Sequence, residues 1–213
     1  MNKYWIFDFD GTLIDSEKHV RETFLKITKE IAPKRLVFAE KVLIGPPLEE
    51  TAKEILGDSQ AKSLKVFTDN FIKIHDNEIL KNTMPYINSE RTLRKLFSMG
   101  HKIAVATNKR WKPTMQIINH FGWDKFFFSI ECSDSEIKRR TKSKMIKDLL
   151  IKDINFQKAF FVGDTLSDGI SAKNNNLRFI KASYGYGHNE NWRNIEMFAE
   201  INDIYELVEL YTK

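Results

Sequence analysis

Residues 8–16 read Asp-Phe-Asp-Gly-Thr-Leu-Ile-Asp-Ser, directly after the apolar residues 4–7, Tyr-Trp-Ile-Phe. Aromatic and β-branched side chains are typical of a buried strand, and Gly11 allows the chain to turn at once beyond it. Because alternate residues of a strand point to the same side, we expect Asp8 and Asp10 to project together. Two neighbouring carboxylates repel each other unless a cation or a shared proton is present. The pair therefore indicates a site for a divalent metal that prefers oxygen ligands.

Two later apolar runs end in polar residues in the same way. Residues 102–106 lead into Thr-Asn-Lys at 107–109, and residues 159–162 lead into Gly-Asp-Thr-Leu-Ser-Asp at 163–168. Ligands of open parallel sheets bind beyond the carboxyl ends of the strands, so we expect these residues to meet the first carboxylate pair.

A basic run separates these two strands along the chain. Residues 138–144 read Lys-Arg-Arg-Thr-Lys-Ser-Lys, and Lys142 opens a helical pattern that can bring a positive charge to the same edge of the sheet. The first three residues of the run, 138–140, are predicted to form a solvated basic face, because blocks of like charge usually lie in solvent.

The order of the patterns predicts an α/β fold with an inserted helical domain. Strands expected at 102–106, 126–130, 159–162 and 178–182 alternate with helices, which favours a parallel sheet with right-handed crossovers. Residues 16–83 instead repeat apolar residues at steps of three and four and carry no strong strand signal.

Together the four segments resemble the haloacid dehalogenase-like hydrolase superfamily, and within it the phosphoglycolate phosphatase-like branch. The matching motifs are Asp-x-Asp-Gly-Thr-Leu-x-Asp-Ser at 8–16, Thr107 after a strand, Lys142 before an amphipathic helix, and Gly-Asp-x-x-x-Asp at 163–168. The resemblance extends over essentially the whole chain. It implies a Rossmann-like parallel sheet core flanked by helices.

The resemblance also implies the domain boundaries. The α/β core would comprise residues 1–15 and 84–213, and residues 16–83 would be a small α-helical cap inserted after the first strand. The cap would close over the site and exclude water, with hinges near residues 15–16 and 84–85.

For the motif residues, the resemblance implies roles in phosphoryl transfer. Asp8 would be the nucleophile that becomes an aspartyl phosphate, and Asp10 the general acid and base. Mg²⁺ would be held by Asp8, the backbone carbonyl of Asp10 and Asp164, with Asp168 acting in a second shell or through water.

Phosphoryl oxygens would be held by Thr107 and Lys142, with Asn108 and Gly11 as further substrate-binding residues. Lys142 is preferred because Lys-x-x-x-Ile followed by two leucines resembles one common form of the third motif. Lys144 is the alternative.

Two glycine-containing loops complete the expected site. Gly45 opens a Gly-Pro-Pro turn that resembles a substrate-reading loop in the caps of this branch, although such a turn is also a simple helix breaker. Residues 184–188 read Tyr-Gly-Tyr-Gly-His and are predicted to form a bent loop that lines the entrance.

The function implied is a Mg²⁺-dependent phosphatase that hydrolyses a small phosphomonoester, such as phosphoglycolate, through an aspartyl phosphate. A phosphosugar mutase uses the same intermediate and stays open as an alternative, as does hydrolysis of pyrophosphate or nucleoside monophosphates. A non-catalytic phosphate-binding module is a further alternative, although all four motifs are present.

Composition bounds these expectations. The chain has 213 residues, 42% of them hydrophobic, a formal net charge of +5 and a single cysteine. This suits one sizeable core with an accessory module, an anionic substrate and a reducing compartment. We expect a cytoplasmic protein whose partner is a small phosphorylated metabolite, with no nucleic acid or membrane partner, and either a monomer or a homodimer.

Overall fold

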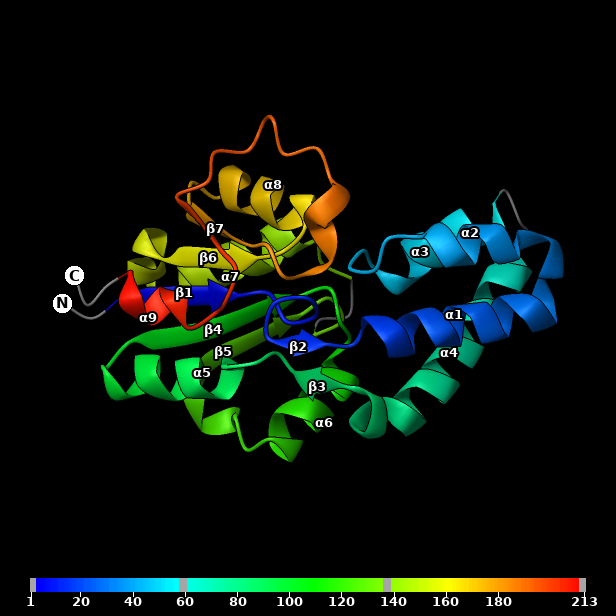
Figure 1. Ribbon diagram of the computed structural model, residues 1–213, viewed down its shortest axis with the longest axis horizontal. Helices are drawn as coiled ribbons and strands as arrows, with labels where there is room; N and C mark the ends of the chain where they lie inside the picture. The colour runs from blue at the N-terminus through cyan, green and yellow to red at the C-terminus, as the bar shows by residue number, and fades with distance from the viewer. Residues whose placement is uncertain (1–2, 58–60, 136–138, 211–213) are drawn as a thin grey trace. The chain divides into compact units, whose positions relative to one another are not determined.

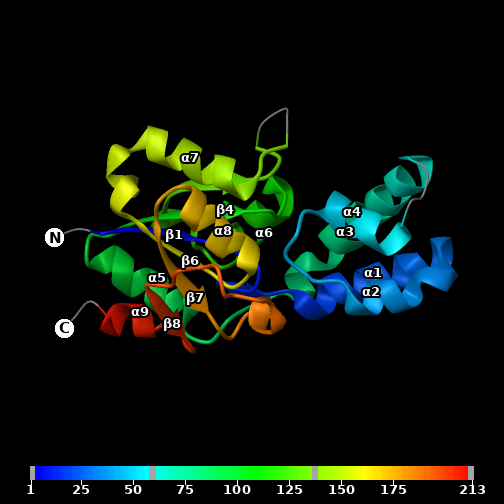
Figure 2. The ribbon, with the colours of Figure 1, turned by 90° about the horizontal axis from the view of Figure 1, so that it is seen from above.

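The computed structural model describes residues 3–57, 61–135 and 139–210. The chain divides into two compact units, which are described in turn (Figures 1 and 2). The first unit comprises residues 1–15 and 84–213, and the second comprises residues 16–83.

A parallel sheet of six strands forms the centre of the first unit, as far as the described residues extend, in the order β5-β4-β1-β6-β7-β8. The strands are β1 (Tyr4–Phe7), β4 (Lys102–Thr107), β5 (Phe127–Cys132), β6 (Phe160–Gly163), β7 (Arg178–Ala182) and β8 (Ala199–Ile201). The predicted α/β fold with a parallel sheet is thus confirmed. The edge strand β8 was not expected, because three residues are too few to show a periodic pattern.

Helices cover both faces of this sheet (Figure 1). They are α5 (Ser89–Ser98), α6 (Trp111–His120), α7 (Lys142–Lys152), α8 (Leu166–Asn174) and the short α9 (Glu206–Glu209), with 3-10 turns η2 (Asp124–Phe126), η3 (Ile154–Lys158) and η4 (Tyr186–Asn189). One core cluster joins β1, β4 and β6 to α7 and α8, whereas α5 and α9 pack together on the opposite face.

The alternation of side chains along β1 determines which face of the sheet the Asp8 side chain points toward. Ile6 belongs to the core cluster with Met145 and Ile146 of α7. Trp5 and Phe7 face the other way and stack on each other with ring centroids 6.2 Å apart. Asp8 follows the parity of Ile6, so the strand delivers this carboxylate toward the face that α7 covers.

Among its described residues, the second unit consists of helices joined by short loops. Its helices are α1 (Glu17–Ile31), α2 (Leu36–Lys41), α3 (Leu48–Leu56) and α4 (Ala61–Asn82), with a 3-10 turn η1 (Pro33–Arg35). The apolar stripes of α1 and α4 meet where the rings of Phe24 and Phe71 lie 4.6 Å apart between centroids. The spacing of apolar residues in this segment therefore corresponds to helix packing.

The chain passes between the units through a short antiparallel pair that belongs to the first unit. Strands β2 (Ile14–Asp15) and β3 (Met84–Pro85) pair with Ile14 opposite Pro85 and Asp15 opposite Met84. The two ends of the segment 16–83 are therefore held side by side.

Along the described residues, no helix combines the length and the apolar character needed to cross a bilayer. The single cysteine, Cys132, ends β5 and is buried, and this burial raises the pKa of its thiol to about 12. It is an interior packing residue, because a thiol with so high a pKa is a poor nucleophile at neutral pH.

Candidate active site

Three carboxylates meet at the carboxyl ends of the central strands. β1 and β6 are neighbours in the sheet, and the N–H of Asp8 donates to the carbonyl of Val162 at 2.9 Å. Asp164 follows the last residue of β6, and Asp168 lies in the first turn of α8. Because adjacent parallel strands end at the same edge, residues 156 positions apart come together here.

The cluster formed by Asp8, Asp164 and Asp168 is buried, with relative exposures of 4%, 1% and 0%. One carboxylate oxygen from each lies within 4.8 Å of the others. Burial and the charge of Asp168 raise the pKa of Asp8 to about 7, against the opposing effect of Lys142. Burial and the two neighbouring carboxylates likewise raise the pKa of Asp164 well above its ordinary value.

The cluster sets three buried carboxylates against the one ammonium of Lys142 described at this point of the structure, which leaves an excess of negative charge. A divalent cation with a preference for oxygen ligands would offset that charge and relieve the repulsion among the three carboxylates. The donor set therefore fits a metal site.

Lys142 is the first residue of α7, and its ammonium group lies between two members of this cluster. Its Nζ is 2.9 Å from Oδ2 of Asp8 and 2.5 Å from Oδ1 of Asp168. Burial alone would lower the pKa of this ammonium, but the charges of Asp168 and Asp8 outweigh burial and raise it. Lys142 is therefore held in its charged form.

Lys144 lies elsewhere on the same helix. Its side chain is half exposed and forms an ion pair with Asp148, one turn further along α7. Its backbone N–H donates to the hydroxyl of Thr141, the N-cap of the helix, at 3.3 Å. Of these two lysines, Lys142 faces the carboxylate cluster and Lys144 faces solvent.

Asp168 uses its second oxygen to fix the start of α8. Oδ2 accepts from the N–H of Thr165 at 2.9 Å and from the hydroxyl of Thr165 at 2.7 Å. It also accepts from the N–H of Asp164 at 3.2 Å. Gly163 leaves room for this arrangement, since a Cβ there would lie 2.5 Å from the Cβ of Asp168. Asp168 thus links Lys142 to the backbone that carries Asp164.

Asp10 is engaged by a different cation. Its Oδ1 accepts from Nζ of Lys109 at 2.9 Å, and both side chains are largely buried, at 15% and 6% exposed. Lys109 belongs to the Thr-Asn-Lys segment at 107–109 that was expected at this edge of the sheet, but no role was predicted for it from the sequence. Its position two residues after Thr107, at the end of a buried strand, is the signal that could have marked it.

The segment after β4 is held by its own hydrogen bonds. Thr107 is the buried last residue of β4, and its hydroxyl accepts from the N–H of Lys109 at 3.1 Å. The carbonyl of Asn108 accepts from the hydroxyl of Ser133 at 2.9 Å. Because β4 pairs with β1, this segment ends at the same edge of the sheet as Asp8.

The two predicted glycines fall in different units. Gly11 has φ +82°, and a Cβ built there would lie 2.1 Å from Oδ2 of Asp164, so its backbone packs directly on that carboxylate. Gly45, with φ +126°, lies in the segment between α2 and α3 of the second unit. The positive φ values explain why glycine occupies both positions.

One expectation for the basic run is wrong. Arg140 is buried rather than solvated, with its guanidinium 2.9 Å from Glu131 and 2.9 Å from Asp148. It is drawn inward because Glu131, near the end of β5, is itself buried and needs a cation. Arg139 is exposed, as expected. Lys138 lies outside the described residues.

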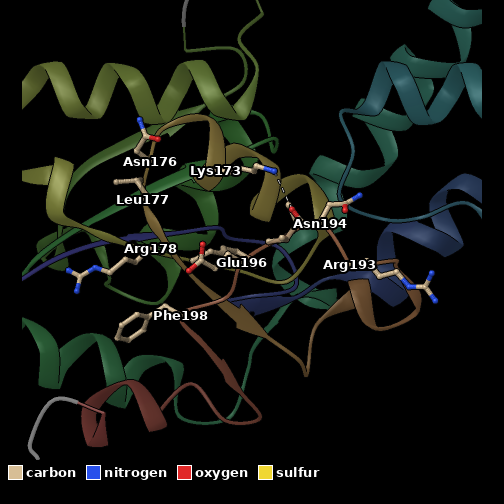
Figure 3. A pocket seen from close by; sticks show the side chains of 10 residues that line it. Lys173, Asn176, Leu177, Arg178, Arg193, Asn194, Glu196 and Phe198 are labelled. Atoms are coloured by element: carbon tan, nitrogen blue, oxygen red, sulfur yellow. Dashed lines mark hydrogen bonds between the residues drawn. The ribbon is translucent and has the colours of Figure 1, made fainter.

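A separate pocket of about 710 Å³ lies beside the amino end of β7, at the opposite end of that strand from the carboxylates (Figure 3). Lys173, Arg178 and Arg193 contribute cations to its lining. The guanidinium of Arg178 lies 3.8 Å from the ring centroid of Phe160, and Figure 3 shows Arg178 and Arg193 pointing in different directions. The three cations do not converge on one point of the pocket.

Comparison with known proteins agrees with this fold. The chain matches the family described as haloacid dehalogenase-like hydrolase over residues 5–182. A phosphoglycolate phosphatase from Psychrobacter arcticus is 27% identical, over 98% of this chain and 95% of its own length. The pyrophosphatase PpaX from Listeria innocua is 29% identical, over 79% of this chain and 77% of its own length. Among solved structures, the crystal structure of a predicted phosphoglycolate phosphatase from Haemophilus somnus 129pt has a TM-score of 0.85 to this chain at 22% identity. The match covers 100% of this chain and 98% of that one, so the two proteins share a fold.

Proposed function

The chain belongs to the haloacid dehalogenase-like hydrolases and is a phosphatase, and we propose that it uses Mg²⁺ to hydrolyse a small phosphomonoester of the phosphoglycolate type. The observation that carries this proposal is the buried cluster of Asp8, Asp164 and Asp168 with the ammonium of Lys142 between two of its members. The phosphoglycolate phosphatase of Psychrobacter arcticus, which aligns with almost all of this chain, supports the substrate class.

In the first step, a carboxylate oxygen of Asp8 attacks phosphorus. The bond between phosphorus and the ester oxygen breaks, its electron pair goes to that oxygen, and Asp10 gives the oxygen a proton. The ammonium of Lys142 and the hydroxyl of Thr107 offset the charge on the phosphoryl oxygens, and Asn108 and Gly11 contribute to binding them.

In the second step, Asp10 takes a proton from water as the water oxygen attacks phosphorus. The bond from phosphorus to Asp8 breaks, and the Asp8 carboxylate is restored together with inorganic phosphate. Asp10 thus acts first as an acid and then as a base, which returns the enzyme to its starting protonation state.

Mg²⁺, held by the carboxylates of Asp8 and Asp164 and the carbonyl of Asp10 with Asp168 behind them, would neutralise charge where two anions must approach each other. Asp168 contributes mainly through its contacts with Lys142 and with the backbone at Asp164. Carboxylate and carbonyl oxygens are the donors that Mg²⁺ prefers, which supports this choice of metal.

Residues 16–83 act in this proposal as a cap that excludes water, and the turn at Gly45 contributes to substrate choice. Hinges at residues 15–16 and 84–85 coincide with the paired strands β2 and β3. We also place the protein in the cytoplasm, in line with a single buried cysteine that has no partner for an intrachain disulfide.

Pyrophosphate is the second candidate substrate. The observation that favours it is the similarity to the pyrophosphatase of Listeria innocua over 79% of this chain. Pyrophosphate would use the same nucleophile, with phosphate as the leaving group in place of an alkoxide. Phosphate needs protonation less than an alkoxide does, so hydrolysis of pyrophosphate should depend less on the acid role of Asp10 than hydrolysis of a phosphomonoester.

The experiment that tests this proposal is phosphate release from phosphoglycolate, hexose phosphates, nucleoside monophosphates and pyrophosphate, with Mg²⁺ and with a chelator. We expect release that depends on Mg²⁺ and is abolished in Asp8→Asn, while Asp124→Asn, which changes an exposed carboxylate, keeps wild-type rates.

Two lysine variants sharpen this test. Lys142→Ala should lower kcat by roughly 10²–10³, the effect of removing one group that stabilises transition-state charge. Lys144→Ala, on the same helix but half exposed, should change kcat little. Undiminished turnover in the chelator, or a larger loss in Lys144→Ala than in Lys142→Ala, would contradict the assignment. Conversion of a hexose phosphate without phosphate release would indicate a mutase.

A further inference from the structure

The loop after β7 lies against the carboxylate cluster rather than only at its entrance. Residues 184–190 follow β7 and contain the 3-10 turn η4, drawn in orange in Figure 1. The sequence predicted that the glycines of this loop bend the chain near the site. The structure gives the loop a specific neighbour, Asp164.

Both oxygens of the Asp164 carboxylate are held by groups from this neighbourhood. The backbone N–H of Tyr186 donates to Oδ2 at 2.8 Å, and the hydroxyl of Thr12 donates to Oδ1 at 3.1 Å. The phenol of Tyr184 donates in turn to the carbonyl of Thr12 at 2.9 Å. The loop and the turn after β1 are therefore connected around one carboxylate.

Glycine is required where the loop packs on Asp164. A Cβ at Gly185 would lie 2.3 Å from the Cβ of Asp164 and 2.4 Å from the carbonyl oxygen of Gly11. A Cβ at Gly187 would lie 2.2 Å from the carbonyl oxygen of Asp164. Real side-chain atoms do not approach this closely, so an added methyl group would displace either the loop or the carboxylate.

The loop is fixed at its far end as well. The carboxylate of Glu190 accepts from the N–H of Leu166 at 2.7 Å, at the first residue of α8. The indole N–H of Trp192 donates to the carbonyl of Gly187 at 3.1 Å. Because α8 also carries Asp168, the loop is tied to the same helix start that supports the cluster.

We propose that residues 184–190, together with Thr12, form a clamp that positions the Asp164 carboxylate and thereby sets the affinity of the cluster for Mg²⁺. This inference rests on the proposed function, which has a metal at this cluster. The clamp residues are positioning residues: they hold a metal ligand in place by a backbone donor, a hydroxyl donor and close packing of two glycines. Partners of metal ligands commonly affect metal affinity in this way.

The test is the dissociation constant for Mg²⁺, measured by isothermal titration calorimetry on the purified full-length protein. Gly185→Ala should raise this constant by about 10- to 100-fold, the range typical for loss of support behind a metal ligand. The matched control is Gly122→Ala, where φ is +64° but a Cβ meets nothing within 4 Å. Ala at this position strains the backbone more than Ala at Gly185, where φ is −84° and ψ is −158°, but it adds no steric clash, so Mg²⁺ affinity should stay unchanged.

Thermal unfolding with a chelator, measured in parallel, separates loss of affinity from loss of fold. If Gly185→Ala does not fold, Thr12→Val replaces it, because it removes the hydroxyl donor to Asp164 at almost constant volume. A folded variant of either kind that binds Mg²⁺ as tightly as wild type would overturn the clamp and leave the proposed function standing. Failure of the wild-type protein to bind Mg²⁺ would overturn the metal assignment itself.

Discussion

At the scale of single residues, the site distributes a few cations among several buried carboxylates. Lys142 lies between Asp8 and Asp168, and Lys109 lies against Asp10. Two aspartates of one motif thus receive different partners, although they are only two residues apart. The proposed mechanism needs such different surroundings, because in it Asp8 stays ionised and Asp10 exchanges a proton.

Lys109 should matter most for substrates with poor leaving groups. Loss of its ammonium in Lys109→Ala leaves Asp10 without this contact, and a displaced acid protonates an alkoxide poorly. We expect kcat/KM for an alkyl phosphate to fall by about a hundredfold, the effect of a misplaced catalytic group. p-Nitrophenyl phosphate, whose leaving group needs no proton, should be affected far less.

The control for this prediction is Lys112→Ala, an exposed lysine in the first turn of α6. Lys109→Arg keeps the charge and should restore part of the loss. An equal fall for both substrates would show that Lys109 binds substrate or supports the fold and does not act through Asp10.

At the scale of elements, a hydrogen bond between β1 and the residue before β4 makes the stability of the fold depend on pH. Trp5 on β1 donates its indole N–H to Nδ1 of His101 at 2.9 Å, just before β4 begins. An indole nitrogen can only donate, so this imidazole must be neutral at Nδ1. Burial, followed by the charge of Lys3, lowers the pKa of His101 below 6.5.

The lowered pKa predicts a loss of stability in acid. Below about pH 6.5 the unfolded chain takes up a proton at His101 that the folded protein binds less readily, so the free energy of unfolding falls as pH falls. His101→Gln keeps an acceptor for Trp5 but does not titrate. Urea unfolding at pH 7, 6 and 5 should show a smaller decline for this variant than for wild type. Parallel declines would mean that His101 protonates equally in both states.

At the scale of the whole molecule, two compact units are built from one chain that crosses between them twice. Both crossings meet at β2 and β3, where Asp15 pairs with Met84. A linker as short as a hairpin turn is therefore long enough to join Asp15 directly to Met84. A short turn can therefore replace residues 16–83 without changing the positions of β2 and β3.

We expect a variant in which a short Gly-Ser turn replaces residues 16–83 to keep the α/β fold and the Mg²⁺ affinity of the cluster. Its discrimination among phosphomonoesters should fall, because the proposed cap and Gly45 are absent. Circular dichroism, Mg²⁺ titration and the substrate panel would check this. Unchanged discrimination would exclude residues 16–83 from substrate choice.

Much of this arrangement could be predicted from short stretches of sequence. Apolar runs followed by Asp8, Thr107 and Asp164 mark strand ends, and their order along the chain predicts a parallel sheet with these residues at one edge. Periodicity in residues 16–83 predicts helices. These inferences succeed because strand burial, helical faces and glycine turns depend on neighbours within a few positions.

The tertiary structure determined the contacts between side chains that lie far apart in the chain. It placed Lys142, which the sequence had preferred over Lys144, against the carboxylates. It also paired Lys109 with Asp10 and buried Arg140, which the sequence assigned to the surface. It also placed the loop 184–190 against Asp164. Spacing along the chain cannot determine such choices, because they depend on which buried charge most needs a partner once the strands and helices have packed.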